Sequence, residues 1–460
     1  MDPAVPEPNH GLRLGYPVLV GAALVACAVV AWHITAFPIA NPFYGLFNNY
    51  TDLRVYRAGA ETVLDGRPLY STSLYRGLGF TYPPFSAIVL VPLALTGPSL
   101  AHVVWWMVGL AALMAVIVIG LRSLGYRLDT RTWVFAGLLT VASTALEPIR
   151  TTLWLGQINI VLMFLVVVDL VLLESLRPNS RFRGVGVGLA AGLKLTPLFF
   201  VIYLLAIRRR FAALVALATF GVTIIVGFVV IPGDAWEYWT RDIAGESRIG
   251  RVDSPANQSI NGFLSQMLAY FDVRRFAHRV PDGPPVFEAP TWMWVPIALI
   301  AVGLGLWAAV LAHRAGRHLL SVTIAGMTAS TVSPFSWGHH WVWFVPLMLV
   351  AFDVAYRSTL SGCRNRLWWW AAPAAIAALS FTWWYHWWGV GPRLGADHPI
   401  ALGLFMMPRW PDPHWWDYLA STLYAGCYPL VLLGTIVVTL IACRKGTISR
   451  RRVVVGSSGF

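Results

Sequence analysis

The chain has 460 residues, of which 57% are hydrophobic and 12% are charged. Soluble globular domains carry about 25% charged residues, so this composition excludes an ordinary soluble protein and indicates a chain surrounded by lipid. The formal net charge of +13 does not indicate nucleic-acid binding, because the basic residues form short clusters between apolar runs, as in cytoplasmic loops of membrane proteins. The cysteines form no CxxC pair, so neither a disulfide framework nor a metal site is expected.

Successive apolar runs predict an all-α polytopic membrane protein with about twelve membrane helices and both ends in the cytoplasm. The runs lie near residues 14–36, 84–96, 99–121, 132–147, 155–176, 184–207, 211–231, 292–313, 318–333, 341–356, 367–385 and 420–443. Several are shorter than the about 20 residues that a straight span needs, so tilted, broken or re-entrant segments are expected. Residues 1–443 read as one transmembrane domain, and 444–460 as a disordered cytoplasmic tail.

The basic clusters predict which loops face the cytoplasm. In the second half they leave two long outer loops, 233–290 and 386–419, and the segment 37–83 reads as the first outer loop with an interfacial helix. In the first half, counting every run as a span places the basic segments 122–131 and 177–183 outside, against the positive-inside rule.

Two re-entrant segments would restore that rule. They are 84–96 and the first part of 184–207. The sequence leaves both topologies open.

Asp52 stands just outside the first apolar run, at the start of a segment that fits an interfacial helix. Residues 51–64 carry apolar side chains at helical spacing, and Thr51 can cap them. Asp52 is therefore a candidate for chemistry, or only an acidic residue that favours a helix N-terminus. Arg54, Tyr56 and Tyr82 are candidate substrate-binding neighbours.

Further polar residues interrupt the apolar runs. Arg150, Gln157 and Asn159 are costly in lipid unless they face a cavity or a neighbouring helix, so they predict either a site or helix–helix hydrogen bonds. Lys194 precedes Pro197, which can break the helix there. A cation at such a break suits an anionic lipid phosphate, although a snorkelling lysine explains it as well.

Two polar groups lie later in the chain. Asn257, Gln258 and Asn261 could hold a sugar through hydrogen bonds, or could serve as turn residues. His339 and His340 are a poor metal pair because adjacent residues do not share a helix face, but one of them can donate to a phosphate while the neighbouring Trp341 packs on a sugar. An interfacial aromatic belt explains the outer tryptophans equally well; these are Trp383, Trp384, Trp387, Trp388, Trp415 and Trp416.

Taken in order, these motifs resemble the GT-C glycosyltransferases of family 87. The resemblance covers residues from about 40 to 360 and rests on Asp52-x-x-x-Tyr56, Tyr82-Pro83-Pro84, Leu155-Gly156-Gln157-x-Asn159, Lys194-Leu195-Thr196-Pro197, Asn257-Gln258-Ser259 and His339-His340-Trp341. It implies a GT-C fold and transfer of mannose from polyprenyl-phosphate-mannose to a mannosylated phosphatidylinositol. The product would carry an α-1,2 linkage, formed at the outer side of the plasma membrane.

The resemblance also implies roles for residues. Asp52 would be the general base in an inverting transfer, and the leaving phosphate would be held by Lys194, Arg150 and one of His339 or His340. Such enzymes use neither a nucleotide cofactor nor an obligatory metal. The same family also suggests a glycosyltransferase acting on lipomannan or branching arabinan.

A lipid or sugar transporter or flippase is the rival class. It predicts several mid-span charges and a repeat between the two halves, whereas Asp169 is the one clear mid-span charge and no repeat is evident. A purely structural membrane subunit would leave Asp52 and Lys194 without a role. The oligomeric state is open.

Overall fold

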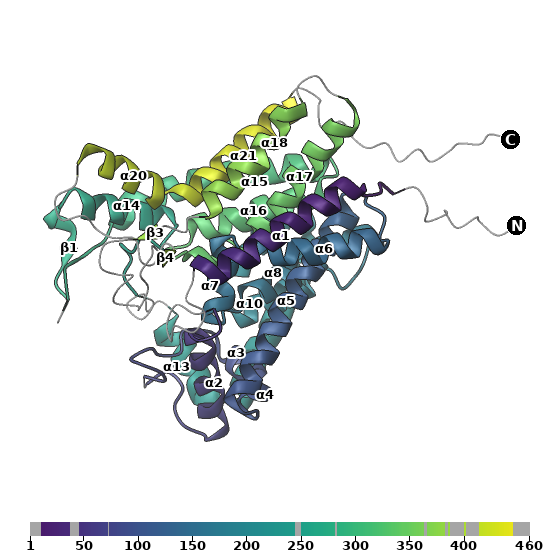
Figure 1. The fold of residues 1–460 in the computed structure, drawn as a ribbon. Coiled ribbons are helices and arrows are strands. Elements are labelled where there is room, and N and C mark those ends of the chain that lie inside the picture. The colour runs from purple at the N-terminus through teal and green to yellow at the C-terminus, as the bar shows by residue number, and fades with distance from the viewer. Residues whose placement is uncertain are drawn as a thin grey trace, which may run out of the picture.

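The computed structural model describes residues 11–36, 46–71, 73–243, 250–280, 283–362, 366–381, 385–386, 400–401 and 414–444. Within these residues the chain is a bundle of helices (Figure 1), with two short antiparallel hairpins, β1 (Ala277–His278) with β2 (Val286–Phe287) and β3 (Tyr385–His386) with β4 (Ile400–Ala401). The expected all-α architecture is confirmed. The aromatic residues Trp383, Trp384, Trp387 and Trp388, most of the loop 386–419 and the tail from residue 445 lie outside the described residues.

Among the described residues, five helical segments are long and apolar enough to cross a membrane. They are α1 (Tyr16–Ala36), α5 (Pro98–Ser123), the continuous segment formed by α8 (Asn159–Val167), η1 (Val168–Leu172) and α9 (Leu173–Leu176), then α12 (Arg210–Val230) and α15 (Thr291–Arg314). A sixth arises if α6 (Thr130–Ser143) and α7 (Glu147–Leu155), which meet at an angle of 79°, form one broken span.

Shorter or more polar helices occupy most of the remaining apolar runs. These are α3 (Pro84–Val89), α4 (Val91–Ala94), α10 (Val185–Leu193), η2 (Thr196–Leu198), α11 (Phe199–Ala206), α16 (His318–Val332), α17 (Phe344–Leu360), α18 (Arg366–Phe381) and α21 (Cys427–Arg444). The expected number of twelve membrane helices is therefore not confirmed. The multi-pass character is confirmed, because several independent segments meet the length and hydropathy that a span requires.

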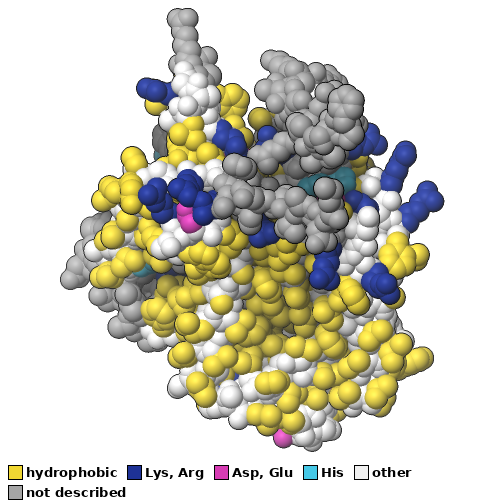
Figure 2. Space-filling view, turned by 90° about the vertical axis from the view of Figure 1, so that its right-hand side faces the viewer, with side chains coloured by type: hydrophobic (Ala, Val, Ile, Leu, Met, Phe, Trp, Pro, Cys, Tyr) yellow, Lys and Arg dark blue, Asp and Glu magenta, His cyan; other side chains and the backbone are white. Residues whose placement is uncertain are grey.

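The basic loops gather at one end of the bundle, which we call the basic end. Arg127 donates its backbone N–H to the Leu12 carbonyl (3.0 Å), and Arg357 donates from its guanidinium to the Leu124 carbonyl (2.6 Å). Arg317 and Arg357 both approach Asp353. Figure 2 looks onto this side of the molecule, and its Lys and Arg side chains lie mainly on the upper half of the view.

The segment 184–207 is a hairpin with both ends at the basic end. Gly184, before α10, donates its backbone N–H to the Asp169 carboxylate, and Arg209, after α11, pairs with Glu174. Its tip, Lys194, instead lies beside Asn159 at the opposite end of the same α8–α9 segment. The segment is therefore re-entrant, and residues 177–183 stay at the basic end, in agreement with the positive-inside rule.

The segment 84–96 does not cross either. Its helices α3 and α4 have six and four residues, which at about 1.5 Å per residue are far too short for a span. They pack beside α12 and α2 (Thr51–Leu64). The helix α2 has the bounds expected from the apolar spacing of residues 51–64, and with α13 (Pro232–Glu237), η3 (Tyr238–Asp242), α14 (Ile260–Tyr270), η5 (Arg274–Phe276) and α20 (Trp415–Ala425) it lies away from the basic end.

Candidate functional site

A cavity of about 450 Å³ lies between α2, the α7–α8 corner, the tip of the 184–207 hairpin and the loop that precedes α17. Six of the candidate residues line it: Asp52, Tyr82, Gln157, Lys194, His339 and His340. They come from segments far apart in the sequence, so the fold brings together the motifs that the sequence presents separately.

The start of α2 fixes Asp52. The backbone N–H of Tyr50 donates to the Trp154 carbonyl (3.0 Å), which ties the helix start to the end of α7. Thr51 was expected to cap this helix, but the residue preceding it is Tyr50, in the left-handed region (φ 47°) and with no side-chain cap. The Asn49 side-chain oxygen instead accepts from the Thr51 backbone N–H (3.0 Å), because Thr51 is already the first helical residue.

Gly156 lets α2 approach the corner between α7 and α8. It ends α7 with φ 72°, and a Cβ built there would lie 2.6 Å from the Cβ of Leu53. Its carbonyl accepts from the Trp105 indole (2.8 Å). A left-handed residue without a side chain is thus required at this corner, and the next residue, Gln157, is delivered beside Asp52.

Gln157 organises the polar wall around Asp52. Its Oε1 accepts from the Tyr56 hydroxyl (2.9 Å), and its Nε2 contacts the Tyr82 hydroxyl (3.2 Å). The Gln157 side chain also hydrogen-bonds the Asp52 carboxyl. Tyr56 is buried behind the cavity wall, so it acts on Asp52 through Gln157.

Burial raises the pKa of Asp52 to about 6, while the hydrogen bond from Gln157 and the charge of Lys194 act in the opposite direction. Desolvation disfavours the carboxylate more than these two groups favour it. Asp52 is therefore ionised at neutral pH, yet it is more basic than an exposed aspartate. These are the properties of a general base.

Opposite Asp52, a cation and an imidazole form a pair. The helix α10 ends at Leu193, and Lys194 adopts an extended backbone (φ −157°, ψ 135°) before Pro197, as the sequence predicted. The Lys194 Nζ lies 2.8 Å from His340 Nε2 and 3.1 Å from Asn159 Oδ1. It also stands 5.4 Å from the centre of the Tyr82 ring.

His340 is the histidine that contacts the lysine. Burial first, and then the charge of Lys194, lower the pKa of His340 well below its usual value, so the ring is neutral and can accept from the ammonium group. His339 also lines the cavity, while its carbonyl accepts from the Thr152 hydroxyl (3.3 Å). The cavity thus holds a carboxylate from α2 and a cation–imidazole pair that an anion can approach.

Several candidate residues are not brought to the cavity. Arg150 and Trp341 are buried in the bundle, with exposed fractions of 2% and 0%, and Trp341 packs on Phe344 and Tyr428. Arg54 lies on α2 with its guanidinium near the Tyr75 ring and hydroxyl. Arg150, Trp341 and Arg54 therefore do not line the cavity.

The amide group at 257–261 is engaged within the protein. Asn257 Oδ1 accepts from the Ser336 backbone N–H (2.9 Å), and Asn261 Nδ2 donates to the Pro334 carbonyl (3.4 Å). Gln258 donates from its side chain to the Tyr424 carbonyl (2.8 Å). The contacts of Asn257 and Asn261 hold the loop that carries His339 and His340, whereas Gln258 ties its segment to α20 (Trp415–Ala425). The three amide side chains do not line the cavity.

Sequence reasoning missed part of the cavity wall. Tyr238, Asp242 and Trp337 line it and suit a sugar, because carboxylates accept from hydroxyls and aromatic faces provide apolar surface. Trp337 belongs to the aromatic stretch before the histidines. Tyr238 and Asp242 follow Pro232 in a segment rich in acidic and aromatic residues, and that composition was the available signal.

Comparison with known proteins identifies a family and named relatives. The family model for glycosyltransferase family 87 matches residues 80–334. A polyprenol-phosphate-mannose-dependent alpha-(1-2)-phosphatidylinositol mannoside mannosyltransferase of Mycobacterium tuberculosis (strain ATCC 25618 / H37Rv) is 35% identical over 371 residues, which cover 76% of this chain and 80% of that protein. A protein of the same description from Mycolicibacterium smegmatis is 34% identical over 66% of this chain and 70% of its own length.

A second kind of relative has a more specific description. It is a polyprenol-phosphate-mannose-dependent alpha-(1-2)-phosphatidylinositol pentamannoside mannosyltransferase of Mycobacterium tuberculosis (strain CDC 1551 / Oshkosh), 35% identical over 66% of this chain and 67% of its own. Among solved structures, ArnT from Cupriavidus metallidurans bound to undecaprenyl phosphate aligns with 95% of this chain and 79% of its own, with 16% identity. The TM-score of 0.32 for that pair is too low to define a shared fold.

Proposed function

From the premise that this chain belongs to glycosyltransferase family 87, we propose that it transfers mannose from polyprenyl-phosphate-mannose to a mannosylated phosphatidylinositol. The new linkage is α-1,2. The relatives named for this donor, linkage and acceptor class match 65% or more of the chain. Family membership makes the chain a glycosyltransferase, and the nature of donor and acceptor is the part that we add.

The observation that carries this proposal is the placement of Asp52 and the Lys194–His340 pair in one cavity. Asp52 takes the proton of the acceptor hydroxyl, whose oxygen attacks the anomeric carbon of mannose from the side opposite the phosphate. The bond between that carbon and the phosphate oxygen breaks, and its electron pair leaves with the phosphate. A β-linked donor thus gives an α product.

The leaving group explains the composition of the site. A lipid monophosphate is a stable anion, so it needs positive charge and hydrogen-bond donors rather than a proton from a second acid. Lys194 supplies the charge at the break of the hairpin. His340 shares a hydrogen bond with Lys194 and thereby orients it.

The position of the site relative to the membrane follows from the basic end. Loops rich in Lys and Arg stay on the cytoplasmic side, and in this structure they lie at the end away from the cavity. We therefore place the cavity at the outer face of the plasma membrane. There, a polyprenyl tail stays in the bilayer while its sugar enters the cavity.

A transfer assay with defined lipids tests the proposal. The full-length protein in phospholipid vesicles is supplied with polyprenyl-phosphate-mannose and either a phosphatidylinositol mannoside or lipomannan. The expected result is one added mannose on the phosphatidylinositol mannoside, with an α-1,2 linkage by product analysis. Transfer to lipomannan alone would assign a different acceptor, and no transfer from the polyprenyl-linked sugar to either would overturn the proposal.

A further inference from the structure

The hairpin formed by α10, η2 and α11 joins the two ends of the bundle. Its two ends, residues 183–184 before α10 and Arg209 after α11, lie at the basic end, and we call them the feet of the hairpin. Its tip carries Lys194 into the cavity. The nine residues of α10 span roughly 14 Å at about 1.5 Å per residue. The place of the Lys194 amine therefore depends on how the feet are held.

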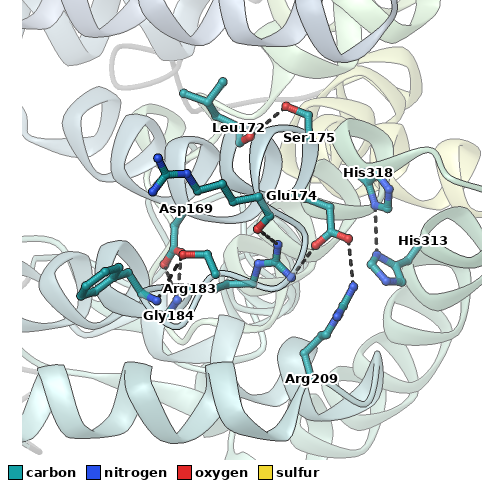
Figure 3. Close-up of polar contacts among 12 residues, drawn as sticks. Asp169, Leu172, Glu174, Ser175, Arg183, Gly184, Arg209, His313 and His318 are labelled. Atoms are coloured by element: carbon teal, nitrogen blue, oxygen red, sulfur yellow. Dashed lines mark hydrogen bonds and ion pairs between the residues drawn. The ribbon is translucent and has the colours of Figure 1, made fainter. Parts of the chain in front are cut away.

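A single carboxylate, Glu174 of α9, holds both feet. It pairs with Arg183, just before α10, at 2.6 Å and with Arg209, just after α11, at 2.9 Å (Figure 3). The side chains of Glu174 and Arg183 are 11% and 5% exposed. A carboxylate shared by two guanidinium groups fixes their separation, because its removal would leave two like charges close together, with that of Arg183 poorly solvated.

Asp169 fixes the start of α10. Its carboxylate accepts from the backbone N–H groups of Gly184 (2.8 and 3.0 Å) and Val187 (3.0 Å), which are unsatisfied donors at the helix N-terminus. Asp169 lies in the π-helical turn η1, and such turns re-aim side chains within a helix. Figure 3 shows Asp169 and Glu174 directed toward this foot from the same helical segment.

The same segment also carries the partner of the hairpin tip. Asn159, the first residue of α8, accepts from Lys194 Nζ. Along α10, Gly188 and Gly192 face α12 so closely that a Cβ on either would come within 2.6 Å of Ala216 or Thr223. Small residues at this spacing allow close helix packing in membranes, so α10 is held along its length as well as at its foot.

We propose that Glu174 and Asp169 are positioning residues for the reaction. They hold the hairpin from the basic end so that the Lys194 amine stands at the donor-phosphate site, and they touch no substrate. This rests on the proposed function, because that function gives Lys194 its role at the phosphate. It extends the functional unit from the cavity to the cytoplasmic end of the bundle.

The sequence provides a reporter for this claim, because Lys194 and Lys445 are its only lysines. The purified full-length protein is treated with an amine-acylating reagent, and mass spectrometry follows acylation of Lys194 relative to Lys445. In Glu174→Gln and Asp169→Asn the Lys194 amine is expected to react about threefold to tenfold faster than in wild type, a range typical of coupling between two sites. Arg209→Gln, which loosens one foot only, should fall between them and wild type.

The matched control is Asp353→Asn. Asp353 is a buried carboxylate at the basic end that pairs with Arg357 (2.6 Å) on its own helix and with Arg317 (3.9 Å) before α16, and neither arginine belongs to the hairpin. Its loss should leave the Lys194 reaction rate at the wild-type value. An unchanged rate in both Glu174→Gln and Asp169→Asn, or an equal increase in Asp353→Asn, would overturn the inference, whether or not the protein transfers mannose.

A double-mutant cycle separates this inference from the proposed function. Glu174→Gln is expected to raise the KM for polyprenyl-phosphate-mannose, whereas combined with Lys194→Ala it should add little, because both act through the same amine. Full additivity contradicts the positioning role. If Lys194→Ala itself leaves the donor KM unchanged, the role of Lys194 in the proposed function is what fails, and the acylation rates still decide how the hairpin is held.

Discussion

Opposing effects set the pKa of Asp52 and therefore its strength as a base. Burial raises its pKa to about 6, and Gln157 and Lys194 limit the rise. Without them the pKa of the carboxyl would be higher still, and less of the carboxylate that accepts a proton would be present at neutral pH. With greater exposure it would be ionised but a weak base. The surrounding side chains, rather than the aspartate alone, therefore make the chemistry possible at neutral pH.

This balance predicts a pH dependence. The raised pKa of Asp52, about 6, means that the active carboxylate is present above that pH and is lost as the pH falls through it. We expect kcat/KM for mannose transfer to be constant near pH 7.5 and to fall about tenfold for each pH unit below about 5.5. A profile that stays flat down to pH 4.5 would contradict the assignment of the base.

Lys194 is the second residue that can be tested alone. Lys194→Ala removes the charge opposite Asp52 and the hydrogen bonds to Asn159 and His340. We expect the KM for polyprenyl-phosphate-mannose to rise by about tenfold to a hundredfold, the size of a lost charged hydrogen bond. Lys445→Ala removes the only other lysine and should leave the donor KM at its wild-type value.

At the scale of elements, the position of the histidine-bearing loop depends on the side chain of Asn257, which lies far away in the sequence. The loop between α16 and α17 carries both histidines, and the Asn257 side chain holds it by accepting from the Ser336 N–H and donating to the Pro334 carbonyl. The backbone bridge between Asn257 and Trp337 adds to this contact. The amide side chain therefore acts on the site through the loop.

Asn257→Ala is expected to loosen this loop. Loss of buried hydrogen-bond partners costs about 1 to 3 kcal/mol, so thermal unfolding should occur at a lower temperature and kcat should fall. Thr435→Ala is a suitable comparison, because that hydroxyl donates to the Val431 carbonyl of its own helix (2.7 Å). If Asn257→Ala unfolds like Thr435→Ala and keeps its kcat, then Asn257 does not position the loop.

The sequence predicted the elements whose causes are local. Apolar spacing gave the bounds of α2, and Pro197 marked the break after Lys194. It could not decide between a sugar-binding and a loop-holding role for Asn257, because an amide offers the same donors and acceptors to both. The family resemblance implied that Arg150 holds the phosphate, whereas that residue is buried and does not line the cavity. These outcomes depend on contacts between segments far apart in the chain.

At the scale of the whole molecule, the arrangement of the basic loops resolves the topology that the sequence left open. Residues 122–131 and 177–183 lie at the same end as Arg209 and Arg357. Hydropathy could not show this, because the re-entrant hairpin 184–207 is as apolar as a full span. The contacts of Gly184 with Asp169 and of Arg183 and Arg209 with Glu174 show that the hairpin returns to the end of the bundle from which it started.

This topology predicts which surfaces a membrane-impermeant thiol reagent reaches in intact cells. In a variant without the native cysteines, Asp272→Cys, in an outer segment, should be labelled directly. Asn179→Cys, at the basic end, should be labelled only after the membrane is permeabilised. Both positions are exposed, so accessibility within the protein does not limit either reaction. The reverse pattern would place the cavity in the cytoplasm.

The most direct test of the account is the turnover of Asp52→Asn, measured with saturating polyprenyl-phosphate-mannose and a phosphatidylinositol mannoside. The amide keeps the shape of the side chain but cannot accept the proton, so kcat should fall by about 10² to 10⁴ while the affinity for the donor is unchanged. Asp242→Asn, which alters another carboxylate of the cavity wall, should keep kcat within about tenfold of wild type. Retention of most of the wild-type kcat by Asp52→Asn, with normal donor binding, would contradict Asp52 as the base.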